Sequence, residues 1–415
     1  MSEIQCADKI RSMVYDAVMS AMITDIHTHL FSRNFGSLLL WGIDDLLTYH
    51  YLVAETMRWA DISYDRFWML SKKEQAELVW QNLFIDHSPI SEACRGVLTV
   101  LNRLGLDTSC RDLQSYRRYF ESIQADKYID SVLDIAGVES VVMTNDPFDN
   151  IERPVWMQGI APDPRFKTAL RLDVLLNSWE TACPMLRDWG YMAEAGFGDK
   201  TLSEVRRFLK DWILRINPVY MAVSLPASFI FPDTSPRSRL ILGCILQVTA
   251  EFDIPFAMMI GVKRAVNPQL RMAGDSVGLS DIGSVEYMCA NYPDNKFLVT
   301  MLSRENQYEL CVTARKFKNL MIFGCWWFLN TPYLINELTR MRIELLGTSM
   351  TPQHSDARVL DQLIYKWDHS RKVIAGVLAD KYADIAATGW CVTRDEIERD
   401  VSDLFGGSFK AFLKS

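Results

Sequence analysis

The 415-residue sequence has no long hydrophobic run and no leader-like start. No stretch approaches the roughly 18–20 apolar residues that cross a membrane, so we expect no membrane partner. The longest apolar run, around Met321 to Leu329, is short. The segment from Ile4 to Met22 lacks the basic start and apolar block of a signal peptide, and its spaced charges predict an amphipathic helix.

Paired cysteine motifs and an excess of positive charge are also missing. The nine cysteines are scattered without a Cys-x-x-Cys, which indicates reduced thiols in a cytoplasmic protein. Lys and Arg number 44 against 52 Asp and Glu, a net charge of −8, and no basic stripe stands out. We therefore expect no nucleic-acid partner. The net negative charge does not exclude a small anionic ligand, because the binding of such a ligand depends on a few local arginines.

Short apolar runs rich in Val, Ile and Met recur along the chain and alternate with helical patterns. There are eight: Ala21–Ile26, Ser140–Thr144, Thr168–Leu172, Tyr220–Leu225, Pro255–Ile260, Phe297–Leu302, Leu320–Cys325 and Glu344–Met350. Most show little polar alternation, as in parallel strands buried on both faces. The pattern predicts an α/β fold, a (β/α)8 TIM-type barrel. A doubly wound open sheet is the alternative, although no Gly-x-Gly-x-x-Gly follows a run.

The first two runs lie too far apart for one crossover helix, which predicts three parts. Residues 1–44 hold the N-terminal helix and first strand, residues 45–127 a helical insertion, and residues 128–415 the rest of the barrel and C-terminal helices. The insertion leaves the catalytic end of the first strand, so we expect it to cover the barrel mouth. Capping boxes at 71–74 and 393–396 predict two helix starts.

His27 and His29 close the first run with one residue between them. Side chains alternate along a strand, so both imidazoles should share a face. Asp356 follows the eighth run, and barrel closure places that run beside the first. Two imidazoles and a carboxylate predict one zinc ion per chain with coordination positions left open for water or substrate. Alternatives are plain polar residues at a strand end and His354 as ligand in place of Asp356, while Asp25 is expected to support the ligands.

Other polar residues lie where the active site of such a barrel belongs, past the strand ends. Three arginines that could grip a carboxylate in bidentate fashion follow separate runs: Arg171, Arg304 and Arg358. Each alone is more often a salt-bridge residue. His50 and Tyr51, at the start of the insertion, could donate a proton or could simply pack. The run from Cys325 to Phe328, which contains Trp326, predicts an apolar wall.

Five strings, in order along the chain, resemble the uronate isomerase family of the amidohydrolase superfamily. They are Thr24-Asp25-Ile26-His27-Thr28-His29-Leu30, His50-Tyr51, Ser303-Arg304-Glu305-Asn306, Gly324-Cys325-Trp326-Trp327-Phe328 and Ser355-Asp356-Ala357-Arg358. The resemblance covers essentially the whole chain, including the helical insertion. It implies a reversible aldose–ketose isomerisation of a hexuronate, D-glucuronate to D-fructuronate or D-galacturonate to D-tagaturonate.

The resemblance also implies roles for individual residues. Zinc would bind His27, His29 and Asp356. Asp356, Tyr51 and Arg358 would serve proton transfer and charge stabilisation. Substrate contacts would come from Arg171, His50, Trp326 and Arg304. We further expect a homo-oligomer.

Hydrolases of the superfamily commonly add a lysine on strand four and histidines after strands five and six. Ser224, Met259 and Thr300 lie in the corresponding regions, so a binuclear site has too few ligands. This favours the isomerase over a mononuclear metal hydrolase of a lactone or amide, which is the main alternative. A barrel that binds a sugar acid without turnover is the second alternative, and the complete set of metal and proton-transfer residues argues against it.

Overall fold

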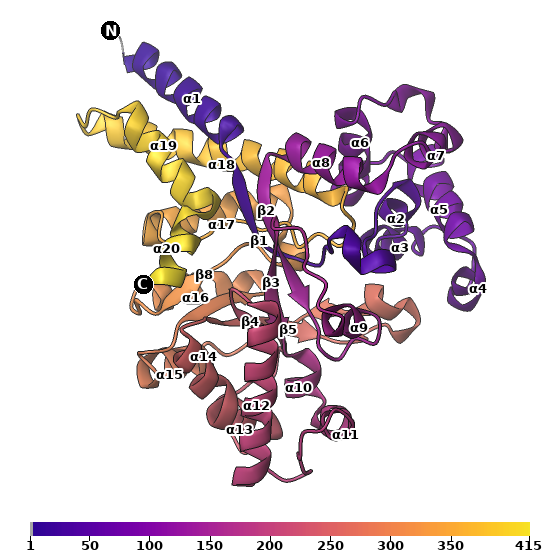
Figure 1. The fold of residues 1–415 in the computed structure, drawn as a ribbon. Helices are drawn as coiled ribbons and strands as arrows, with labels where there is room; N and C mark the ends of the chain where they lie inside the picture. The colour runs from indigo at the N-terminus through magenta and orange to yellow at the C-terminus, as the bar shows by residue number, and fades with distance from the viewer. Residues whose placement is uncertain (1–2) are drawn as a thin grey trace.

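The computed structural model describes residues 3–415 as a curled sheet surrounded by helices (Figure 1). Its strands are β1 Ile23–Thr28, β2 Val138–Asn145, β3 Phe166–Arg171, β4 Met221–Pro226, β5 Phe256–Lys263, β6 Ser276–Val277, β7 Phe297–Met301 and β8 Leu320–Ile322. The order β1-β2-β3-β4-β5-β7-β8 is parallel throughout, and the short β6 pairs antiparallel with β5. This is a TIM-barrel-like α/β fold, as the sequence predicts.

The prediction of the eighth strand over Glu344–Met350 is wrong. Helix α17, Pro332–Leu346, runs into that segment and ends at Gly347, whose φ is 61°. The apolar residues read as a strand are the half-buried last turn of this helix. The other seven runs all overlap observed strands.

The chain after α17 closes the barrel by single backbone contacts instead of a strand. Phe323 forms an isolated parallel bridge with Thr351. The Asp356 amide then donates to the His27 carbonyl at 3.2 Å, and the His29 amide donates to the Ala357 carbonyl at 2.7 Å. The segment that carries Asp356 is therefore tied directly to the end of β1.

Between β1 and β2 the chain is helical, as predicted. The elements are η1 Arg33–Leu38, α2 Ile43–Leu47, α3 His50–Thr56, α4 Tyr64–Met69, α5 Lys72–Trp80, η2 Gln81–Ile85, α6 Glu92–Arg103, η3 Thr108–Cys110, α7 Leu113–Glu121 and α8 Ala125–Ala136. The capping box of Ser71 and Glu74 starts α5. The predicted boundaries fall inside α2 and α8, and Figure 1 shows α2–α7 grouped on one side of the sheet.

The remaining helices surround the strands or follow the barrel. They are α1 Glu3–Ser20, α9 Glu152–Met157, α10 Asp173–Asn177, α11 Trp179–Asp188, α12 Asp199–Ile216, α13 Pro236–Leu240, η4 Ile241–Ile245, α14 Leu246–Phe252, η5 Pro268–Gly274, α15 Gly283–Asn291, η6 Arg304–Asn306, α16 Gln307–Ala314, η7 Trp327–Leu329, α18 Gln362–Ala387, α19 Arg394–Ser402, η8 Asp403–Gly407 and α20 Ser408–Lys414. The predicted N-terminal helix is α1, and α19 starts at the second capping box. No helix in residues 3–415 is long and apolar enough to cross a membrane.

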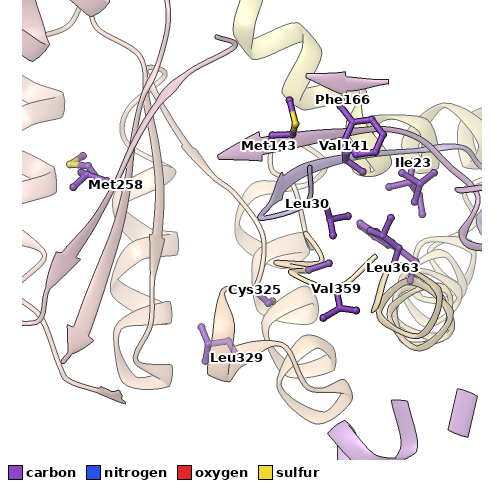
Figure 2. Packing of buried hydrophobic residues seen from close by; sticks show 14 of the residues in the cluster. Ile23, Leu30, Val141, Met143, Phe166, Met258, Cys325, Leu329, Val359 and Leu363 are labelled. Carbon is purple, nitrogen blue, oxygen red and sulfur yellow. The ribbon is translucent and has the colours of Figure 1, made fainter. Parts of the chain in front are cut away.

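Two apolar layers hold the fold together. The outer layer lies between the strands and their helices, and Figure 2 shows part of it, with Ile23 of β1 and Leu363 of α18 labelled. The inner layer fills the barrel and includes Met259, together with Phe409 and Phe412 of α20. Lys296, just before β7, donates to the Leu413 carbonyl at 3.0 Å. Helix α20 thus closes the amino end of the barrel, and the functional residues lie at the other end.

Candidate active site

His27, His29 and Asp356 converge at the carboxyl end of β1. Asp356 Oδ1 lies 3.6 Å from His27 Nε2 and 3.4 Å from His29 Nε2. One ligand atom from each residue lies within 4.8 Å of the others. His27 Nε2 and Asp356 Oδ1 are buried and have no hydrogen-bond partner in the described part of the chain. Unpaired buried donors and acceptors are costly, so this geometry fits a group that could hold a metal ion.

Strand β1 is irregular where it carries these residues. Asp25 pairs with Val141 of β2, whereas Thr28 pairs with Met143, so three steps on one strand match two on the other. His27 lies inside this bulge, a feature that re-aims side chains next to active sites. The strict alternation used in the sequence prediction is therefore interrupted, although the imidazoles do converge.

The hydroxyl of Tyr220, the residue before β4, orients the His27 ring. His27 Nδ1 lies 3.2 Å from the Tyr220 hydroxyl, which donates its own proton to the Ile26 carbonyl at 2.8 Å. The hydroxyl can then only accept from the ring, so the network assigns the proton of His27 to Nδ1. Burial lowers the pKa of His27 to about 3. The ring is neutral at pH 7 and presents a bare Nε2.

The same arrangement recurs at the second histidine. His29 Nδ1 lies 2.8 Å from Thr144 Oγ1, which donates to the Thr28 carbonyl at 3.0 Å. Burial lowers the pKa of His29 well below its ordinary value. Sequence reasoning missed both hydroxyls, because a tyrosine before one strand and a threonine within another carry no local signal. Such outer contacts fix the tautomer of metal-ligating histidines.

Asp25 lies outside the His27, His29 and Asp356 group and contacts the segment that carries Asp356. Its buried carboxylate accepts from the Ser355 amide at 3.1 Å and from Trp367 Nε1 at 2.9 Å. Burial raises its pKa to about 6. Asp356 has a φ of 52°, a costly conformation for a residue other than glycine that is often retained at functional sites. Asp25 holds the turn in which this conformation occurs.

The alternative ligand His354 is fully buried, and its ring centre lies 5.0 Å from that of His27. The group that could hold a metal ion consists of His27, His29 and Asp356 and does not include His354.

A pocket of about 60 Å³ opens beside the His27, His29 and Asp356 group. We call it the inner pocket, and it is lined by His29, Tyr49, His50, Arg171, Ser224, Arg264, Met272, Asp275, Trp326, Trp327, Asp356 and Arg358. The structure thus brings four predicted residues, Arg171, His50, Trp326 and Arg358, next to the ligands. Burial lowers the pKa of Arg358, and the described side chains of residues 7–415 offer it no ion pair within 4 Å.

Tyr51 lies one layer behind this lining. Its ring centre is 4.6 Å from that of His50 and 6.1 Å from that of Phe328. Burial raises the pKa of the Tyr51 phenol well above its ordinary value, and the charge of Asp356 adds to the shift. Tyr49, two residues earlier, lines the pocket itself.

Arg304 is not brought to the inner pocket. It opens η6 with its side chain about half exposed, and it pairs with Glu337 of α17 at 3.0 Å. Its expected place among the substrate contacts is therefore not supported. The salt bridge, the commoner role for such an arginine, accounts for it.

Arg171 keeps one edge of its guanidinium free. Its Nε and Nη2 each lie 3.1 Å from a carboxylate oxygen of Asp173. This pairing lowers the pKa of Asp173 against the opposing effect of burial. The remaining edge, with Nη1, is available to a ligand in the inner pocket.

The fold and the His–His–Asp group at the carboxyl end of the strands place the protein in the class of TIM-type barrels with a candidate metal centre. The comparison with solved structures narrows this class. The chain is 59% identical to a uronate isomerase from Bacillus halodurans, over 98% of this chain and 97% of that one, with a TM-score of 0.97. The chain belongs to the uronate isomerase family.

More distant structures share the fold. A uronate isomerase from Thermotoga maritima has a TM-score of 0.78 at 15% identity, covering 98% of this chain and 97% of that one. A glucuronate isomerase from Caulobacter crescentus has a TM-score of 0.77 at 15% identity, covering 98% and 94%. No protein-family model and no curated protein sequence matches the chain.

Proposed function

We propose that the protein catalyses the reversible isomerisation of hexuronates, D-glucuronate to D-fructuronate and D-galacturonate to D-tagaturonate. The observation that carries the proposal is the joint presence of Asp356, Arg358 and Arg171 around one small pocket in a member of the uronate isomerase family. An aldose–ketose exchange between C1 and C2 needs a base, an acid and stabilisation of an enediolate. Asp356 and Arg358 line this pocket, and the phenol ring of Tyr51 packs behind His50 in its wall.

Proton transfer is assigned to Asp356 and Tyr51. Asp356 takes the proton from C2, and the phenol of Tyr51 protonates the developing oxygen of the carbonyl group. The raised pKa of Tyr51 keeps the phenol protonated, which suits a donor. Asp356 then returns its proton to C1, and the C2 hydroxyl gives its own proton to the Tyr51 phenolate as the ketone forms. Both residues are restored, and the ketose arises with no gain or loss of atoms.

Charge on the substrate is assigned to the arginines. Arg358, which has no ion pair of its own in the described residues, stabilises the negative oxygen of the enediolate. Arg171 offers its free edge to the carboxylate. His50 and Trp326 complete the walls and orient the sugar.

Zinc, one ion per chain, is the metal we assign to His27, His29 and Asp356. Two neutral imidazoles and a carboxylate are a ligand set typical of catalytic zinc, with positions left open. Bound there, the ion would polarise the carbonyl and hydroxyl of the substrate.

We propose a cytoplasmic homo-oligomer as the working form. Eight of the nine cysteines are described, and all eight are free thiols, six of them buried. This suits a reducing compartment.

The test is a time course followed by NMR and mass spectrometry. The metal-loaded protein is incubated with D-glucuronate or D-galacturonate, and in parallel with the ketouronates. We expect products of unchanged mass and the same final ratio from either side. Inert hexuronates, with a lactone or amide that gains the mass of water, would establish the hydrolase instead.

A further inference from the structure

A second, larger cavity adjoins the inner pocket. We call it the outer chamber; its volume is about 530 Å³, and it is lined by Arg171, Asp173, Val174, Asn177, Ser178, Ser224, Pro226, Arg237, Val262 and Arg264. It shares Arg171, Ser224 and Arg264 with the inner pocket. Pockets for small ligands usually measure about 300–1,000 Å³, so the inner pocket alone is too small. A ligand that reaches the metal group must extend toward the outer chamber.

The outer chamber is positively charged although the protein carries a net charge of −8. Three arginines and one aspartate line it, which leaves two positive charges in excess. Arg171 is paired with Asp173, and Arg264 lies 2.5 Å from Asp275.

Arg237 of α13 is the arginine without such a partner. No carboxylate among the described side chains, residues 7–415, lies within ion-pair distance of it. Its Nη2 donates to Asn177 Oδ1 at 3.0 Å, while its Nε is buried and has no hydrogen-bond partner. A buried, unsatisfied donor on a charged group costs stability. A carboxylate in the chamber would supply the negative charge that this guanidinium lacks.

The position of Arg237 relative to the inner pocket is fixed by the strand between them. Asn177, which accepts from Arg237, itself donates to the Ser224 carbonyl at 3.0 Å. The Ser224 amide donates to Asp173, the partner of Arg171, at 3.3 Å. A short hydrogen-bonded chain thus connects the free arginine to the arginine shared by both cavities.

We propose that the outer chamber is a carboxylate-binding subsite, in which Arg237 receives the charged end of a sugar acid whose reacting end lies in the inner pocket. The subsite rests on the proposed function for the identity of the sugar acid. It adds a recognition residue on α13 that neither the sequence motifs nor the metal group includes. Specificity for acids over neutral sugars then comes from Arg237 as well as Arg171.

The test measures binding without turnover. D-gluconate is an open-chain six-carbon acid with no carbonyl to isomerise, and D-glucitol is its uncharged counterpart. Calorimetric titration of the metal-loaded protein with each compound separates recognition of the carboxylate from recognition of the hydroxyls. Arg237→Gln is compared with Arg239→Gln, an equal change of charge at an exposed position on the same helix.

We expect Arg237→Gln to weaken D-gluconate binding by about tenfold or more. D-glucitol binding and the melting temperature should not change. Arg237→Lys keeps the positive charge but loses the planar guanidinium, so its affinity for D-gluconate should lie between those of the wild type and Arg237→Gln. Arg239→Gln should bind both compounds like the wild type.

Three results would overturn the subsite: wild-type D-gluconate affinity in Arg237→Gln, an equal loss of D-glucitol binding, or no D-gluconate binding by the wild type. The proposed isomerisation is judged separately by turnover of hexuronates. Active protein with unchanged Arg237→Gln binding would refute the subsite alone. Inactive protein with the expected binding pattern would refute the isomerase alone.

Discussion

The two ends of the barrel are built on opposite principles. At the amino end, Phe409 and Phe412 of α20 pack into the barrel interior. At the carboxyl end, Asp356 and Trp327 have positive φ angles, and several buried polar atoms have no partner. Apolar contacts at one end stabilise the fold, while the other end retains buried polar atoms without a partner, which is typical of functional sites.

Cavity size alone would place the functional site at the amino end of the barrel. A cavity of about 710 Å³ lies beside α20 and β8, and its lining includes Leu320, Leu346 and Phe412. No histidine or aspartate lines it. Candidate metal ligands and arginines line the smaller inner pocket instead, so the two ends should respond differently to substitution.

The largest effect is expected from removing the metal-binding imidazoles. The double substitution His27→Ala/His29→Ala should reduce the metal content from nearly one ion per chain to nearly none and abolish activity. Circular dichroism should be unchanged, because the fold is held by the apolar layers. Elemental analysis measures the ion, and His87→Ala, at an exposed histidine, is the matched control. Equal metal in the double variant and the wild type would refute the assignment.

Tyr51→Phe removes only the hydroxyl of the tyrosine that packs behind His50. If that phenol donates a proton, kcat should fall by roughly 10²-fold or more with the melting temperature unchanged. Steady-state kinetics of Tyr51→Phe and Tyr49→Phe distinguish the two phenols. A larger loss in Tyr49→Phe would transfer the role to the residue that lines the inner pocket.

Tyr220→Phe tests the hydroxyl that orients His27. Outer contacts of this kind are worth about 10–100-fold in metal affinity. We expect a loss in that range in chelator competition. Thr144→Val should behave likewise through His29. Unchanged affinity in both variants would mean that the hydroxyls do not fix the rings.

Phe412→Ala tests the amino end. Large-to-small changes of buried aromatics cost about 3–5 kcal/mol, so the free energy of unfolding should fall by about 3 kcal/mol. The kcat should stay within about twofold, because the site lies at the other end. Phe328→Ala, at a residue 36% exposed at the mouth, should cost much less in the same denaturant titration. A reversal of the two stabilities would contradict the comparison.

The smallest effect is expected at Arg304. Arg304→Gln breaks an exposed pair with Glu337 and should leave kcat/KM within about twofold. Arg171→Lys, which replaces a fork with a point charge, should lower kcat/KM by about tenfold or more. Kinetics of both variants with D-glucuronate make the measurement. An equal loss of kcat/KM in both variants would mean that Arg304 contributes to substrate binding.

The contrast between the ends also explains what the sequence could predict. His27 and His29 lie at the end of a correctly predicted strand, and their convergence with Asp356 is confirmed, although the run that was used to place Asp356 is helical. The capping box at Ser71 depends on neighbours three residues apart and is confirmed as well. These features are local, or they follow from the order of strands in a barrel.

Other features depend on contacts that no local pattern encodes. The segment Glu344–Met350 has a strand-like composition, yet the helix begun at Pro332 continues into it until Gly347. Tyr220 reaches His27 across 193 positions of sequence. Arg237 resembles any other charged residue of a short helix until the cavity beside it is seen.

The two hydroxyl-held imidazoles have a consequence for how the protein takes up its ion. Metal binding usually displaces protons from the ligands, because histidine must be neutral to coordinate. In both His27 and His29 the hydrogen bond to the hydroxyl places the ring proton on Nδ1, so that Nε2 carries no proton before any metal binds. Binding of a cation there would therefore release no proton from either ring, and neither ring would add a buffer-dependent contribution to the heat of association.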